Sequence, residues 1–482
     1  MQPKRLLIGL LFMGAMACNK TVTTMPEITN TNAKKYTNTD INTWIHQEMS
    51  AYYLWPEKMP ALAKTNTSSN PTNYFYSILN DYPTTDRFSW IDSSSTNLIN
   101  NNNGFKKILG ISVNFFPDDT EANNAMVIAY VLKGSPAEKS GLKRGDIILS
   151  VDDKAVTSSN YISLLQNQTL KLGLGAYNNK VFSSIGKTVT VTKVELQTNP
   201  ILQDTVINWA GKKVGYFAYS QFIGYVKDPN TGKEYNFDDS LRAVFGRFKD
   251  KGVNELVIDL RYNGGGYISS SDLLTNLIVK DLASKVGKVM NKRQYNDALT
   301  KEIIRQNGEA DLITNFKMES NNIGSLNRVF VLTSTGTASA SELIINNLKP
   351  FMTVILIGEH TYGKNVGSFP ITDDAKRWNY GLQPIVLKIL NSLDQSDYGT
   401  LNGFLPDYAL LDDALPYKLL GDPNETYFNK ALSIIGPVAY KANAIGSLRP
   451  VSRAKKLQGA SISDNPIQDK FDMFDKPLKH KN

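Results

Sequence analysis

The chain has 482 residues, which is enough for about three domains. Hydrophobic residues make up 41% and charged residues 20%, so the chain can form sizeable cores and is too poor in charge to be largely disordered. The net charge of +8 comes from 53 basic and 45 acidic side chains, a mild excess that argues against nucleic-acid binding.

Cysteine and histidine are scarce. Cys18 is the one cysteine, so no intramolecular disulfide can form. The three histidines, His46, His360 and His480, are far apart, and no CxxC or HExxH pattern is present. We therefore expect no metal site, and the sequence implies no organic cofactor.

Residues 1–18 have the pattern of an export signal. A basic pair at 4–5 precedes an apolar run at 6–16, which has the length of a signal-peptide hydrophobic region and is too short to span a bilayer. The small residues before Cys18 resemble a bacterial lipobox, with Ala15 in place of the usual leucine. We predict lipidation of Cys18 and an exported protein anchored in the bacterial cell envelope, in the outer membrane. An ordinary signal peptide beside a buried cysteine is the alternative.

Residues 19–40 are rich in Thr and Asn, which is typical of a solvated tether. Residues 41–104 predict a small helical unit. Four apolar side chains recur there at helical spacing: Trp44, Ile45, Met49 and Tyr52. An Asn- and Ser-rich stretch at 93–104 marks the expected end of this unit.

Residues 105–197 combine short β-rich runs with one helical turn. Runs at 108–113 and 126–132 precede GSPAEKSGLKRGDIILSV at 134–151. Its Ser-Pro pair suits the start of a short helix at Ser135, and the Gly-Leu pair suits the end. This sequence resembles a PDZ domain.

A PDZ domain binds an extended peptide as an added strand and holds the peptide carboxylate with backbone N–H groups. The resemblance assigns the carboxylate-binding loop to Leu109, Gly110 and Ile111. A PDZ fold that only packs against its neighbours is the alternative.

Residues 205–440 alternate strands with helices, which predicts an α/β core with buried, largely parallel strands. Strands are expected at 214–219, 255–260, 329–332 and 354–357. Helices are expected from Asp238, which can act as N-cap, from 273 and at 340–348. Periodicity is lost from 441, so 441–482 is expected to be a solvated, mobile tail.

Three stretches of this core carry candidate chemistry. TSTGTASASE at 333–342 lies between a strand and a helix, where a hydroxyl is held at a sharp turn and the helix N-terminus favours an oxyanion. A helix cap without chemistry gives the same local pattern. GEHTYGK at 358–364 presents Lys364, which could activate a serine hydroxyl if its amine were neutral.

DLRYNGGG at 259–266 is the third stretch. Glycines after a strand expose backbone N–H groups, which suit an oxyanion hole or a phosphate cradle. The run fits neither GxxxxGK[ST] nor GxGxxG, which disfavours nucleotide binding.

The order DLRxNxGG, SASE and GxxTxGK after a PDZ domain resembles the carboxyl-terminal processing (tail-specific) peptidase family, over residues 40–430. The resemblance implies a crotonase/Clp-protease-like α/β core at 205–440, preceded by the PDZ domain and the helical unit. YLW at 53–55 and DRFSW at 86–90 resemble lipoprotein members from Bacteroidetes-type bacteria.

The resemblance also assigns roles. Ser339 falls on the nucleophile and Lys364 on the general base, with oxyanion donors at Ala340 and at Gly265 or Gly266. Many members have a glutamine four residues after the lysine.

This chain has Ser368 at that position, and its hydroxyl can accept a hydrogen bond from the amine. Glu342 lies one helical turn from the nucleophile, where it either aligns the site or only stabilises the helix N-terminus. His360 is the alternative base and is disfavoured, because Lys364 already fits that role.

The expected function is a serine endopeptidase that cleaves proteins or peptides near free C-termini docked on the PDZ domain. An exported peptide- or glycan-binding lipoprotein without catalysis is the alternative. An acyl-CoA enzyme on the same core is disfavoured, because CoA is scarce outside the cytoplasm.

Overall fold

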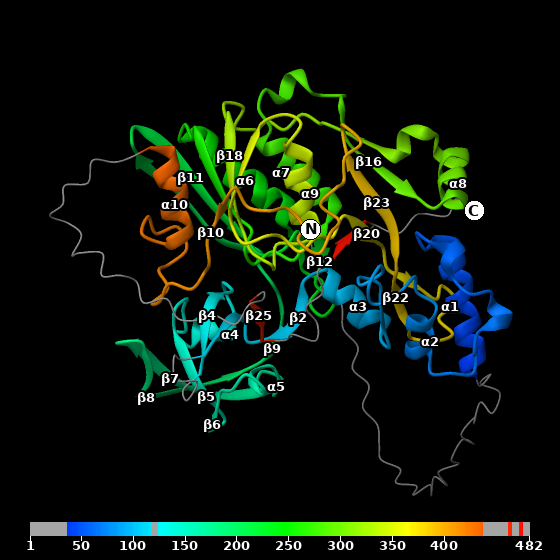
Figure 1. The fold of residues 1–482 in the computed structure, drawn as a ribbon, viewed down its shortest axis with the longest axis horizontal. Coiled ribbons are helices and arrows are strands. Elements are labelled where there is room, and N and C mark those ends of the chain that lie inside the picture. Colours follow the sequence, from blue (N-terminus) through cyan, green and yellow to red (C-terminus); the bar gives the residue numbers. More distant parts are fainter. Residues whose placement is uncertain (1–35, 118–123, 437–460, 465–471, 476–482) are drawn as a thin grey trace, which may run out of the picture.

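The computed structural model describes residues 36–117, 124–436, 461–464 and 472–475. Cys18 and the predicted export signal lie outside these ranges. The described chain forms a helical N-terminal unit, a PDZ domain and a larger α/β core (Figure 1). Within the described ranges, no helix combines the length and apolar character that crossing a membrane requires.

The N-terminal unit is built from α1 (Asn38–Tyr52), α2 (Pro71–Ser77) and α3 (Ser95–Asn102), with the 3-10 helices η1 (Pro56–Lys58) and η2 (Leu62–Lys64) and the short strand β1 (Trp90–Asp92). Thr37 and Asp40 form a reciprocal capping box at the start of α1. The predicted apolar face is buried at Trp44, Ile45 and Met49. The Asn- and Ser-rich stretch expected to be a boundary forms α3, which Ser94 caps.

The PDZ domain is an antiparallel sheet with two short helices. Its elements are β2 (Phe105–Ile108), β3 (Ile111–Phe116), β4 (Ala125–Val131), α4 (Pro136–Lys139), β5 (Ile147–Val151), β6 (Lys154–Ala155), α5 (Tyr161–Leu164), β7 (Thr169–Asn178), β8 (Val181–Thr192) and β9 (Val194–Gln197). Ser135 caps α4, as predicted, by accepting from the Glu138 N–H. The sheet order is β25-β3-β4-β5-β7-β8, and its first strand, β25 (Ile462–Ser463), comes from the C-terminal part of the chain.

The core contains the predicted sheet. It runs β10 (Ile201–Trp209), β11 (Lys212–Tyr219), β14 (Glu255–Asp259), β18 (Arg328–Thr333), β19 (Thr353–Gly358) and β24 (Tyr408–Ala409). The pairs from β11 to β24 are parallel, and only β10 is antiparallel to its neighbour.

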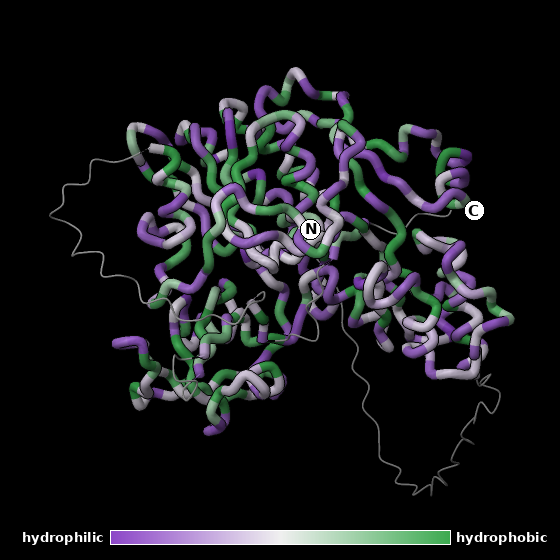
Figure 2. Tube along the Cα trace, in the orientation of Figure 1, coloured by the Kyte–Doolittle hydropathy of each residue, from purple (hydrophilic) through white to green (hydrophobic). Residues whose placement is uncertain are grey.

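Helices cover both faces of this sheet, so its strands are buried on both sides. One apolar cluster joins alternate strand residues to α6 (Phe237–Asp250), α7 (Ile268–Ile278) and α9 (Ala340–Leu348). The other joins the intervening residues to α10 (Thr426–Ile435). Figure 2 shows hydrophobic residues along these central strands and helices.

A second sheet lies beside the first, in the order β15-β26-β20-β23-β16-β17. Its strands are β15 (Gly266–Tyr267), β16 (Val289–Tyr295), β17 (Ile313–Asn315), β20 (Val366–Ser368), β23 (Ile385–Asn391) and β26 (Met473–Phe474). The remaining elements are β12 (Tyr225–Lys227), β13 (Glu234–Asn236), η3 (Leu282–Ser284), α8 (Asp297–Asn307), η4 (Glu309–Leu312), β21 (Ile371–Thr372) and β22 (Gly381–Gln383).

Three expectations differ from the structure. Asn236, not Asp238, caps α6, because its side chain accepts from the Asp239 N–H. Helix α7 begins at Ile268, immediately after the glycine-rich loop, not at 273. The tail was expected to be solvated, but β25 pairs with the PDZ domain and β26 pairs with the core.

Candidate active site

Ser339 lies at the turn between β18 and α9, as the N-cap of the helix. Its backbone has φ 65° and ψ −114°, and the residue is fully buried. A non-glycine residue at such a φ costs on the order of 1–3 kcal/mol, and such strain concentrates at functional sites. Among the residues that the structure describes, the Ser339 hydroxyl oxygen has no hydrogen-bond partner. The turn therefore buries this hydroxyl at the start of the helix.

The Glu342 carboxylate joins this turn to the lysine loop. Its Oε2 atom accepts the N–H groups of Ser339 and Lys364, each at 2.8 Å. Its Oε1 atom accepts the Gly363 N–H at 2.7 Å and the Thr361 hydroxyl. Because one oxygen receives both backbone donors, the nitrogens of Ser339 and Lys364 cannot be farther apart than twice 2.8 Å.

Burial raises the pKa of Glu342, and the four donors oppose that rise. The sequence allowed two roles for Glu342, alignment of the site or stabilisation of the helix N-terminus. Its contacts do both, since Ser339 is the helix N-cap and Lys364 belongs to a separate loop.

Lys364 follows β19 and is completely buried. Its Nζ atom donates to Oδ1 of Asp472 at 2.7 Å and lies 5.2 Å from the centre of the Phe88 ring. The preceding glycine is required, because a Cβ on Gly363 would lie 1.7 Å from the Thr400 carbonyl oxygen.

The N-terminal unit contacts the lysine loop through Arg87 as well as through Phe88. Nη2 of Arg87 donates to the carbonyl oxygens of Tyr362, Gly363 and Thr400 at 3.1, 3.3 and 3.3 Å. The DRFSW stretch therefore holds the loop that carries Lys364.

Asp472 was not foreseen as a site residue. Besides Lys364, its carboxylate accepts the Trp90 indole N–H at 2.8 Å and the Ser368 hydroxyl at 3.2 Å. Ser368 was expected to accept from the lysine amine. In the structure, Ser368 and Lys364 both donate to the same oxygen of Asp472.

A buried glutamine does reach this position, from another strand. Nε2 of Gln383, on β22, donates to the Ser368 hydroxyl at 2.8 Å, and its Oε1 accepts from Asn102 at 3.2 Å. In the sequence, Ser368 stands where many family members have a glutamine. That difference was the sequence feature indicating that another residue completes the hydrogen bonds around Ser368.

The glycine-rich loop follows β14 and runs alongside Ser339. The Gly265 N–H donates to the Asn263 side chain at 2.9 Å, whereas the Gly266 N–H donates to the carbonyl oxygen of Asp472 at 2.6 Å. Gly266 has φ 133°, and a Cβ there would lie 2.1 Å from the Phe222 carbonyl oxygen, so only glycine fits. Of the two predicted glycine donors, Gly266 is therefore the one that faces a carbonyl.

Ala340, the other predicted oxyanion donor, is the first residue of α9 and is fully buried. Its carbonyl accepts the Ser271 hydroxyl from α7 at 2.8 Å. The N–H of Ala338 donates to Asn263 at 3.1 Å, which ties the nucleophile turn to the glycine-rich loop.

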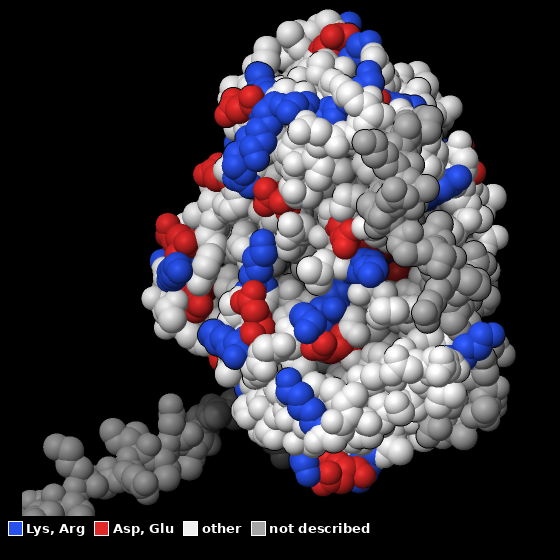
Figure 3. Space-filling view, turned by 90° about the vertical axis from the view of Figure 1, so that its left-hand side faces the viewer, with Lys and Arg blue, Asp and Glu red and all other residues white. Residues whose placement is uncertain are grey.

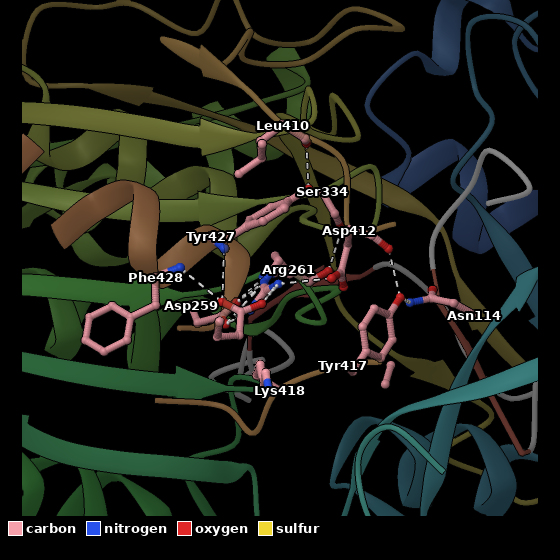
Figure 4. A network of polar contacts seen from close by, with 12 residues as sticks. Asn114, Asp259, Arg261, Ser334, Leu410, Asp412, Tyr417, Lys418, Tyr427 and Phe428 are labelled. Atoms are coloured by element: carbon pink, nitrogen blue, oxygen red, sulfur yellow. Dashed lines mark hydrogen bonds and ion pairs between the residues drawn. The ribbon is translucent and has the colours of Figure 1, made fainter. Parts of the chain in front are cut away.

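A buried ion-pair network surrounds Arg261, which directly precedes the glycine-rich loop (Figure 4). Arg261 is fully buried and contacts Asp259 at 2.6 Å, Glu425 at 2.8 Å and Asp412 at 3.5 Å. Arg144 of the PDZ domain reaches the same acids, Glu425 at 3.5 Å and Asp412 at 3.6 Å. The network therefore joins the PDZ domain to the strand end that carries the glycines.

The predicted carboxylate loop of the PDZ domain holds a carboxylate. The N–H groups of Leu109, Gly110 and Ile111 all donate to the Asp464 side chain. His360 makes a local contact instead, with Nδ1 at 2.8 Å from the carbonyl oxygen of Thr361.

Comparison with protein families matches three stretches of the chain. Residues 40–90 match the peptidase S41 N-terminal domain, 127–172 the PDZ domain, and 213–382 peptidase family S41. The last two stretches lie inside the regions predicted to be the PDZ domain and the peptidase core.

Curated relatives agree with these matches. A chloroplastic C-terminal processing peptidase of Tetradesmus obliquus is 27% identical over 251 residues, which are 52% of this chain and 50% of the relative. A carboxyl-terminal-processing protease of Synechocystis is 24% identical over 358 residues, 70% of this chain and 71% of the relative. The chain thus spans about half the length of the first of these relatives.

Among solved structures, an S41 protease from Bacteroides fragilis aligns with a TM-score of 0.67 and 29% identity, covering 81% of this chain and 96% of the other. The chain therefore belongs to peptidase family S41, with an S41 N-terminal domain and a PDZ domain beside its peptidase domain.

Proposed function

We propose that the protein is a serine endopeptidase in which Ser339 is the nucleophile and Lys364 the general base. The observation that carries this proposal is the Glu342 bridge, which fixes the backbones of both residues on one carboxylate oxygen. Both side chains are fully buried, so bulk water does not compete for the hydroxyl or for the amine.

The chemistry follows the usual acyl-transfer sequence. Lys364 takes the proton from Ser339, whose oxygen bonds to the scissile carbonyl carbon. The N–H groups of Gly266 and Ala340 stabilise the oxyanion, and Lys364 returns its proton to the departing amine. Water then attacks the acyl-enzyme, and the serine hydroxyl is restored.

The PDZ domain supplies the preference for C-terminal substrates. Three N–H groups, from Leu109, Gly110 and Ile111, converge on one carboxylate, which is the arrangement that receives a terminal carboxylate. The substrates proposed here are proteins or peptides with free C-termini. Nucleic acid is not proposed as a partner, because the net charge is only a mild excess of basic over acidic side chains, and both kinds are present on the face in Figure 3.

Export and lipidation at Cys18 are part of the proposal and rest on the sequence pattern of residues 1–18. A cell-envelope location places the protein among unfolded or secreted chains with exposed C-termini. Metabolic labelling with a fatty-acid analogue tests this point, because Cys18→Ala should abolish the label.

The activity is tested with a peptide library whose members have either free or amidated C-termini. We expect cleavage of the free forms, slower cleavage of the amidated forms, and none by Ser339→Ala. Ser433→Ala, which removes an exposed serine on α10, should behave as the wild type. Equal cleavage by Ser339→Ala would refute the nucleophile, and equal rates on both peptide forms would refute the C-terminal preference.

A further inference from the structure

Two short pieces of the C-terminal region lie in the two sites that a substrate would use. The first is β25, which pairs antiparallel with β3 of the PDZ domain, with Ile462 opposite Val113 and Ser463 opposite Ser112. The N–H of Asp464 continues this pairing by donating to the Ile111 carbonyl at 3.1 Å. The segment is therefore an added strand that runs toward the carboxylate loop, as a PDZ ligand does.

The Asp464 side chain takes the place of a terminal carboxylate. It receives the three loop N–H groups and is only 1% exposed. The Lys193 ammonium donates to the Asp464 backbone carbonyl, so this end of the strand is held on both sides. Burial of an unpaired carboxylate is strongly disfavoured, and here the three N–H groups compensate for it. The loop therefore forms a binding site for a carboxylate.

The second piece, β26, lies in the candidate active site. It pairs in parallel with β15 on one side and with Ser368 of β20 on the other. Met473 and Phe474 are 0% and 2% exposed, and the Phe474 ring packs at 4.4 Å from that of Tyr267. The strand thus fills the space between the glycine-rich loop and the strand that follows Lys364.

Asp472, at the start of this piece, contacts two groups that the proposed reaction needs. Its carbonyl oxygen accepts the Gly266 N–H, and its carboxylate accepts from the Lys364 amine at 2.7 Å. Asp472 therefore occupies both the proposed base and a proposed oxyanion donor.

Asp464 and Asp472 are only eight positions apart in the sequence, and one lies in each site. An internal ligand of this kind acts at the high effective concentration of a short tether.

We propose that the C-terminal segment is an internal peptide ligand of the PDZ groove and the active-site cleft, which blocks the peptidase until a peptide with a free C-terminal carboxylate displaces it. The inference rests on the proposed function, because the groups that β26 covers are the proposed base and oxyanion donor. A carboxylate that displaces Asp464 therefore favours displacement of Asp472, which is only eight positions away.

The experiment uses the full-length protein with Asp464→Ala, Asp472→Ala and a control, Asp250→Ala, which changes an exposed aspartate at the end of α6. One readout is binding of a fluorescent peptide with a free C-terminus, measured with Ser339→Ala in every variant so that no catalysis is needed. The other readout is the rate at which a fluorophosphonate labels Ser339 in the catalytic background.

We expect Asp464→Ala to strengthen peptide binding by about tenfold or more, and Asp472→Ala to raise the labelling rate by a similar factor. The control should change neither. Peptide binding by Asp464→Ala equal to that of the wild type would overturn the proposal.

Slower labelling in Asp472→Ala would also overturn it, because Asp472 would then position the base instead of blocking it. If Asp472→Ala does not fold, Asp472→Asn, which keeps the shape and removes the charge, makes the same comparison. If Ser339 is never labelled in any variant, the proposed peptidase activity fails, while the binding readout still decides whether the segment occupies the PDZ groove.

Discussion

Two buried charge centres organise the peptidase core, and they are built differently. Glu342 is held by backbone N–H groups and a hydroxyl, all within the two loops that carry Ser339 and Lys364. Arg261 is held by the neighbouring Asp259 and by Glu425 and Asp412 from the C-terminal part of the core, and Arg144 of the PDZ domain shares the last two. Backbone donors fix the positions of neighbouring loops, whereas an ion-pair network holds separate regions together.

The largest expected effect comes from breaking the ion-pair centre. Arg261→Met leaves the buried Asp259 and Glu425 without their principal cation, so the free energy of unfolding should fall by about 3–5 kcal/mol. Denaturant unfolding measures it, with Arg305→Met, a 69% exposed arginine on α8, as control. A loss no larger than in that control would show that the network does not stabilise the core.

Breaking the other centre should affect activity more selectively. Glu342→Ala leaves the N–H groups of Ser339, Gly363 and Lys364 without their acceptor, which costs about 1–3 kcal/mol for each buried group left unpaired. We expect peptide cleavage by the folded fraction to fall by about 100-fold, because a misplaced base loses its proton-transfer geometry.

Rates are normalised to the folded fraction from circular dichroism, and Glu309→Ala on η4 is the exposed control. Unchanged cleavage per folded molecule would contradict an aligning role for Glu342.

The pH dependence of stability distinguishes the two centres further. Burial raises the pKa of Glu342 above its usual value of 4.5. Just above pH 4.5, the Glu342 carboxyl is therefore more protonated in the folded protein than in the unfolded chain, so folding is favoured at the lower pH. The contribution of Glu342 is therefore full below pH 4.5 and is lost as pH rises through the raised pKa. Glu342→Gln should remove this part of the pH dependence, which thermal unfolding at several pH values measures. A slope identical to that of the wild type would contradict the shift.

The smallest expected effect concerns Gln383, at the edge of the site. Gln383→Leu removes its hydrogen bond to Ser368, which is worth about 0.5–1.5 kcal/mol and corresponds to a few-fold loss in kcat/KM. The matched control is Gln166→Leu, which changes an exposed residue of the PDZ domain. If kcat/KM falls no more than in the control, Gln383 plays no part in positioning Ser368.

The parallel sheet and α9 were predictable from the sequence, because apolar runs and helical spacing are local signals. The region at 340–348 is the helix Ala340–Leu348, and the four predicted strands are β11, β14, β18 and β19. The resemblance assigned Ser339 and Lys364 to one site, and in the structure their loops follow the neighbouring strands β18 and β19.

Asp472 was not predictable in this way, because it contacts Lys364 across 108 positions of sequence. Strands as short as β25 and β26 carry no periodicity of their own and form only by pairing with existing sheet edges. For the same reason Gln383, placed by the pairing of β22 with β1, gave no local signal.

The most direct test of the central claim is covalent labelling of the nucleophile in the full-length protein. With a fluorophosphonate and an excess of a peptide with a free C-terminus, we predict a single label on Ser339, located by mass spectrometry. Lys364→Ala should label about 100-fold more slowly, whereas Lys301→Ala, an exposed lysine on α8, should label as the wild type does. Label on another residue, or wild-type labelling of Lys364→Ala, would contradict the Ser339–Lys364 dyad.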